Sequence, residues 1–73
     1  MFLNKVKSGE KFQIQFIPQE LKAELTRLGI CEGEDFSCVV KIPKGPAVIL
    51  RDLQEIAIGE EFCKRIEIFN KGH

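Results

Sequence analysis

Apolar and polar residues alternate along much of this chain, and one short segment follows helical spacing instead. Phe12, Ile14 and Phe16 alternate with polar residues, which predicts a strand with one buried face. Pro18 ends that strand. It suits the first turn of a helix, where its missing N–H costs no hydrogen bond. The pattern therefore predicts a strand followed directly by a helix.

The predicted helix covers Gln19–Leu28 and has a well-marked end. Three leucines fall on one face at i, i+4 and i+7, namely Leu21, Leu25 and Leu28. Gly29 can adopt the left-handed conformation that often follows a helix, and Ile30 then packs back on Leu25, as in a Schellman ending. We therefore expect the chain to reverse sharply at Gly29.

The second half of the chain is a series of short strands separated by turn residues. Strands are predicted over Phe36–Ile42, Ala47–Arg51, Glu55–Ile58 and Arg65–Phe69, with one tight helical turn within Gly59–Lys64. The tract Lys44–Ile58 holds two of these strands and contains no metal-ligand cluster, nucleophile or phosphate loop. Five short strands and one early helix favour a small, closed or nearly closed barrel, because closure removes exposed strand edges. With 73 residues, the chain is expected to be one domain, 1–73.

The strand Ala47–Arg51 is apolar on both of its faces. If Val48 and Leu50 point inward, Ala47 and Ile49 point outward. Three further apolar residues fall out of phase with their inward-facing neighbours, and these are Ile17, Val39 and Phe69. Either the helix covers some of these residues and the rest are scattered surface apolars, or they form a docking patch. The candidate partner-binding residues are Val39, Ala47, Ile49 and Phe69.

The balance of charge argues against several kinds of partner. Lysine plus arginine and aspartate plus glutamate each number 11, and the two signs are interleaved. A nucleic-acid-binding module usually carries a basic face, so no nucleic-acid partner is expected. No apolar run approaches the roughly 20 residues that span a bilayer, and the N-terminus lacks the apolar core of a secretory signal. We expect a cytoplasmic protein without direct membrane insertion, whose thiols are reduced.

The three cysteines are the only metal-ligand candidates of note. Cys31, Cys38 and Cys63 lack the close pairing of a zinc knuckle. Cys38 takes an inward slot in the alternating series Phe36, Cys38, Val40, Ile42, so a core thiol is the better interpretation. The same interpretation extends, with less support from the pattern, to Cys31 and Cys63. A metal site would need all three thiolates to converge.

Catalytic constellations are absent from the sequence. The single histidine, His73, is the last residue, so neither a Cys–His nor a Ser–His–Asp set is available. Most glutamates lie beside lysine or glycine in polar turns, where a solvated charge is the usual outcome. We therefore expect a protein that is not an enzyme and that requires no cofactor.

The order and spacing of these marker residues resemble the FeoA family, the small ferrous iron transport protein A. The resemblance covers nearly the whole chain and rests on Leu3, Val6, Gly9, Leu25, Leu28-Gly29-Ile30, Gly33, Gly45-Pro46, Val48-Ile49, Ile56-Ala57-Ile58, Gly59-Glu60, Ile66 and Ile68. One departure is the turn Asp52-Leu53-Gln54, where many relatives carry glycine.

The resemblance implies an SH3-like β-barrel and a cytosolic accessory role in bacterial ferrous iron uptake. It implies interaction with the FeoB-type membrane transporter and supplies no ligand residues. A similar barrel forms the C-terminal domain of diphtheria-toxin-repressor-type regulators, so the alternative is a small module that binds or senses transition metals. That module would use the three cysteines or surface carboxylates. A second copy of the chain, as in a homo-oligomer, is a further candidate partner. An SH3-type peptide groove is disfavoured because the chain has no Trp and no Tyr.

Overall fold

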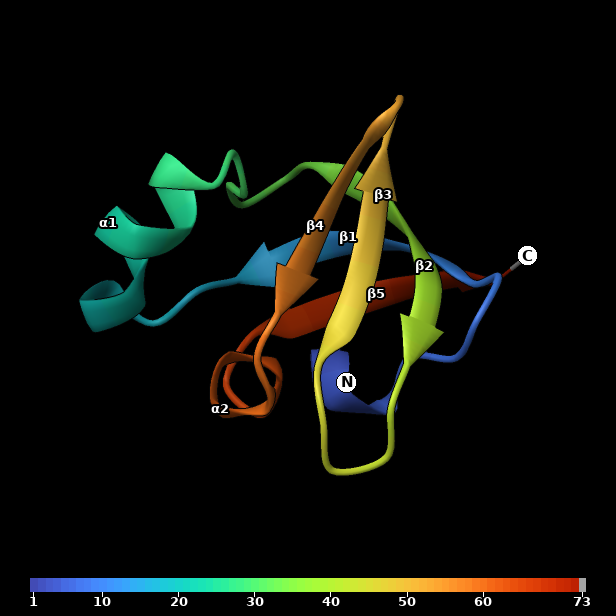
Figure 1. The fold of residues 1–73 in the computed structure, drawn as a ribbon. Coiled ribbons are helices and arrows are strands. Elements are labelled where there is room, and N and C mark those ends of the chain that lie inside the picture. The colour runs from blue at the N-terminus through green and yellow to red at the C-terminus, as the bar shows by residue number, and fades with distance from the viewer. Residues whose placement is uncertain (73) are drawn as a thin grey trace.

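The architecture is a five-stranded antiparallel sheet curled around one core, with a helix after the first strand (Figure 1). A computed structural model describes residues 1–72. The elements are a 3-10 helix Leu3–Lys5, β1 Lys11–Phe16, α1 Gln19–Arg27, β2 Asp35–Lys41, β3 Ala47–Arg51, β4 Gln54–Ile58, α2 Glu60–Cys63 and β5 Glu67–Gly72. The predicted mainly-β, SH3-like class with its early helix is confirmed.

The strands follow the order β4-β3-β2-β1-β5, and all neighbours are antiparallel. In Figure 1 the β3–β4 hairpin crosses steeply over β1 and β5. No pairing joins the edge strands β4 and β5 among residues 1–72, so the closure we considered from the sequence is not reached. An isolated bridge between Phe2 and Glu67 lies beside the β5 edge. The barrel is therefore open, with the N-terminal segment lying against one of its edges.

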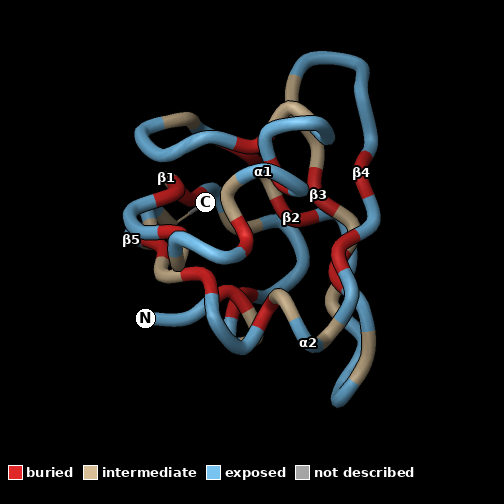
Figure 2. The backbone as a smooth tube through the Cα atoms, turned by 90° about the vertical axis from the view of Figure 1, so that its left-hand side faces the viewer, coloured by how far each residue is buried: buried red, intermediate tan, exposed pale blue. Residues whose placement is uncertain are grey.

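One contiguous apolar core fills the space inside the sheet. Its buried members are Leu3, Val6, Phe12, Ile14, Ile17, Leu21, Leu25, Ile30, Phe36, Cys38, Ala47, Ile49, Ile56, Ile58, Cys63, Ile66 and Ile68. Figure 2 shows that the residues outside this core are largely exposed, at the tips of the hairpins and over most of α1. No buried polar or charged residue interrupts this core among the described residues.

The helix α1 ends as predicted, in a left-handed turn at Gly29. Gly29 has a φ of +87°, its N–H donates to the Thr26 carbonyl at 2.9 Å, and the Ile30 N–H donates to the Leu25 carbonyl at 2.9 Å. These are the two bonds of a Schellman motif. The helix ends at Arg27, one residue before the predicted end, and Leu28 is 39% exposed rather than aligned with the buried Leu21 and Leu25. Ile30 is buried with Leu25 in the core, as expected.

We predict that Gly29→Ala destabilises the protein by about 1 to 2 kcal/mol, and Gly29→Val by more. A side chain in the left-handed region costs about 1 kcal/mol. A Cβ at this position would also lie 2.9 Å from Arg51 Nη2 and displace that side chain. Gly33→Ala is the matched control, because Gly33 has a φ of +91° but open space around its Cβ position. Denaturant unfolding should rank Gly29→Ala as the more harmful. Wild-type stability of Gly29→Val would contradict the proposed helix ending.

Candidate functional site

The orientation of β3 is the reverse of the one expected from its sequence. Ala47 and Ile49 are fully buried, whereas Val48 and Leu50 are half-buried on the outer face. The register explains this outcome, because Ile49 pairs with Cys38 on β2 and with Ile56 on β4, both of which face the core. Ala47 and Ile49 are therefore unavailable as docking residues.

A β-bulge in β2 accounts for a second correction. The register between β2 and β3 shifts between Cys38 and Val40, which leaves Val39 as the extra residue. Val40 and Ile42 consequently leave the inward phase that Phe36 and Cys38 follow, and they are exposed. Val39 is exposed as expected.

These two features create an apolar patch on the outer face of the sheet. The outer patch consists of Val40, Val48, Leu50 and Ala57. Val48 pairs directly with both Val40 and Ala57, and Leu50 follows Val48 on the same face of β3. Val40 and Ala57 are exposed, and the exposed Val39 precedes Val40 on β2. The strand β3 is therefore apolar on both faces, and Val48 and Leu50, not Ala47 and Ile49, lie on its outer face.

The other predicted surface residues lie elsewhere. Phe69 is 55% exposed on β5, and β1 and β2 separate it from β3 in the sheet. Ile17 is buried, with its N–H donating to Glu32 Oε2 at 2.8 Å. The structure therefore does not gather the residues that the sequence had singled out into one surface.

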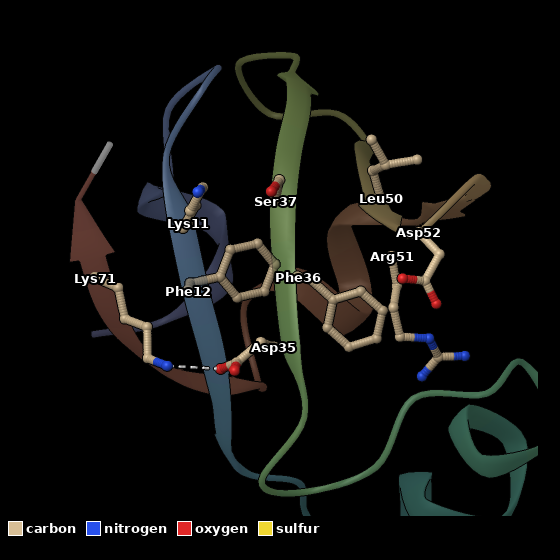
Figure 3. A pocket seen from close by; sticks show the side chains of 9 residues that line it. All are labelled: Lys11, Phe12, Asp35, Phe36, Ser37, Leu50, Arg51, Asp52 and Lys71. Atoms are coloured by element: carbon tan, nitrogen blue, oxygen red, sulfur yellow. Dashed lines mark hydrogen bonds and ion pairs between the residues drawn. The ribbon is translucent and has the colours of Figure 1, made fainter.

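A groove adjoins the outer patch through Leu50, which belongs to both (Figure 3). The groove has a volume of about 260 Å³ and is lined by Lys11, Phe12, Asp35, Phe36, Ser37, Leu50, Arg51, Asp52 and Lys71. The rings of Phe12 and Phe36 stack with centroids 6.1 Å apart. Lys71 and Asp35 form an ion pair of 2.9 Å at its edge. Three basic and two acidic side chains make this a rim of mixed charge.

Arg51 links this groove to the end of α1. Its Nη1 donates to the Gly29 carbonyl at 2.7 Å and to Glu34 Oε1 at 2.9 Å. Its guanidinium carbon lies 5.2 Å from the centroid of the Phe36 ring, within the range of a cation–π interaction. Glu34 Oε1 also accepts the N–H of Cys31 at 3.2 Å. One arginine thus fixes the relative position of the helix end, β2 and β3.

Sequence reasoning missed Arg51, Val48 and Leu50 as surface candidates. A charged residue at the end of an apolar strand gives no indication of partners 17 and 22 positions away in the chain. The doublet Val39-Val40, which breaks strict alternation, was the available signal for a bulge.

The cysteines do not converge. Cys38 and Cys63 are buried as expected, while the expected burial of Cys31 is wrong because it lies in the exposed turn after Ile30. Burial raises the pKa of the Cys38 thiol and that of the Cys63 thiol. Within residues 1–72, no group of three or more His, Cys, Asp or Glu is placed to hold a metal ion. His73 lies outside the described residues.

Comparison with known proteins identifies a family and a fold. The sequence model for the family described as FeoA domain matches residues 1–69. A crystal structure described as an iron uptake regulatory protein, FeoA, superposes with a TM-score of 0.85 over 96% of both chains. The two sequences are 21% identical, so this likeness concerns the fold. A search of curated proteins finds no match. Across the described residues, no helix has both the length and the apolar character needed to cross a bilayer.

We predict that a thiol reagent at pH 8 modifies one cysteine quickly in the native protein and the other two only on unfolding. Cys31 is exposed, whereas Cys38 and Cys63 are buried and keep their protons because their pKa values are raised. Stability should fall as the pH rises above the ordinary thiol range, since thiolates favour the unfolded chain.

The control for this experiment is Cys31→Ser, which should remove the fast phase entirely. Two or three fast-reacting thiols in the native protein would contradict the buried positions of Cys38 and Cys63.

Proposed function

The chain belongs to the FeoA domain family, and from this premise we propose that it is a cytosolic accessory protein of bacterial ferrous iron transport that binds and regulates a FeoB-type membrane transporter. Family membership supports the role in ferrous iron transport. The direct contact with the transporter's cytosolic part, and its regulatory consequence, are our inference. The mode of action is protein–protein interaction.

The single observation that carries the proposal is the outer patch beside the groove. Val40 and Ala57 are exposed and flank the half-buried Val48, so a partner could remove contiguous apolar surface from water there. Arg51 lies next to this patch, and its contacts with the Gly29 carbonyl, Glu34 and the Phe36 ring fix its position. Interfaces are enriched in arginine, and a rigid surface loses less entropy on binding.

The charges around the groove fit a protein partner of mixed charge. Its rim carries three basic residues and two acidic ones, namely Lys11, Arg51 and Lys71, and Asp35 and Asp52. Complementary charges on a partner would set the orientation of docking, while the outer patch would supply the apolar contact. A second copy of the chain is the competing occupant of this surface.

We predict that Val40→Lys and Leu50→Gln each weaken binding to the cytosolic part of the transporter by about tenfold or more, which corresponds to about 1.4 kcal/mol. Both positions face outward, so the melting temperature should change little. Isothermal titration calorimetry with the purified cytosolic part measures the affinity directly. Leu53→Lys is the matched control, because Leu53 is fully exposed at the tip of the β3–β4 hairpin, outside the outer patch.

Three further results would decide against the proposal. The first is absence of binding to both the cytosolic part and the full transporter, together with unchanged iron uptake on deletion of the gene. The second is equal loss of binding in Leu53→Lys. The third is a concentration-dependent dimer that Val40→Lys dissociates while transporter binding persists, which would assign the patch to self-association.

A further inference from the structure

A second cavity, with no lining residue in common with the groove, gathers positive charge at the other end of the barrel. It has a volume of about 370 Å³ and is lined by Asn4, Lys5, Val6, Lys7, Lys41, Pro43, Lys44 and Glu60. The 3-10 helix, the β2–β3 loop and α2 meet there, at the lower end of the view in Figure 1. Four lysines and one glutamate give the lining a formal charge of +3, in a chain whose net charge is zero.

The ammonium groups of three of the four lysines lack an ion pair within residues 1–72, although the backbone N–H of Lys7 donates to Glu10 Oε1 at 2.8 Å. Among residues 1–72, the ammonium groups of Lys5, Lys7 and Lys44 make no ion pair, whereas six other basic residues do. Like charges around one cavity repel one another, so an anion bound there would be stabilised by the lysines that line it.

Lys41 forms the inner wall of this cavity. Its side chain is only 8% exposed, and its Nζ donates to the Ile42 carbonyl at 2.6 Å and lies 3.3 Å from Glu60 Oε1. That carboxylate oxygen is buried and has no hydrogen bond in this geometry. An ammonium group has three donors, so Lys41 retains donor capacity for a ligand in the cavity.

The turn between β2 and β3 places the fourth lysine of the lining. Lys44 has a φ of +56°, a left-handed conformation that favours glycine or asparagine. Lys44 is the third residue of a turn closed by the Gly45 N–H, which donates to the Ile42 carbonyl at 2.8 Å. This turn holds Lys44 among the residues that line the cavity.

We propose that this lysine cavity binds the phosphate group of a small molecule. A tetrahedral oxyanion accepts hydrogen bonds on every side, so it can take them from lysines of the 3-10 helix, β2 and the β2–β3 loop at once. The concave, lysine-rich wall with one side chain, that of Lys41, only 8% exposed favours a compact anion over an extended acidic segment. Free inorganic phosphate and the phosphate of a nucleotide share this chemistry.

The test is a titration of the full chain, labelled with nitrogen-15, with inorganic phosphate at constant ionic strength adjusted with sodium chloride. The expected result is saturable amide shifts in residues 5–7, 41, 42, 44, 45 and 60. Lys5→Gln and Lys44→Gly should each weaken binding about two- to fivefold, the contribution of one partly exposed ion pair. Lys44→Gly should also raise the melting temperature, since glycine relieves the left-handed conformation, so lost binding cannot reflect unfolding.

Lys22→Gln is the matched control, because Lys22 lies on α1 and pairs with Glu32 outside the cavity. Adenosine 5′-monophosphate distinguishes the two sources: tighter binding than inorganic phosphate assigns the site to a nucleotide, and equal binding assigns it to free phosphate. The proposal is overturned by shifts that do not saturate, or by equal weakening in Lys22→Gln. It is also overturned if a glutamate-rich peptide binds where phosphate does not, which would assign the lysines to an acidic protein partner.

Discussion

The reversal of the chain at Gly29 is the constraint on which the rest of the fold depends. The left-handed residue stops α1 and sends Ile30 into the core beside Leu25. The same turn presents the Gly29 carbonyl to Arg51, which reaches it from the end of β3. A carbonyl near the negative end of a helix is a favourable partner for a guanidinium group. The turn therefore joins the helix to the sheet through both apolar packing and a charged hydrogen bond.

This connection also shapes the candidate docking surface. Arg51 lies over the Phe36 ring and donates a hydrogen bond to Glu34. Several contacts, rather than one, therefore fix this wall of the groove beside the outer patch. Rigid walls of this kind lower the entropic cost of binding. The lysine cavity is built differently, from the N-terminal 3-10 helix, α2 and the β2–β3 loop. A small barrel thus offers an apolar surface and a cationic cavity that share no residues.

The sequence predicted the elements well because each has a local signal. Alternation marked β1, the spacing of leucines marked α1, and the Leu28-Gly29-Ile30 triplet marked the reversal. The orientation of β3 was predicted wrongly, because both of its faces are apolar and alternation alone cannot choose between them. The neighbouring strands determine which face is buried. Cys38 and Ile56 face the core and pair with Ile49, and the bulge at Val39 turns Val40 outward.

The sequence by itself determined the fold class, the helix ending, the burial of Cys38 and the resemblance to a family that the match over residues 1–69 bears out. These depend on backbone preferences and on apolar periodicity, which are encoded within a few residues. The tertiary structure alone decided which face of β3 is exposed, that Cys31 lies apart from the two buried thiols, and that four lysines surround one cavity. Each of these depends on strand register or on contacts between segments far apart in the chain. A pattern of neighbouring residues in the sequence specifies neither the register nor such contacts.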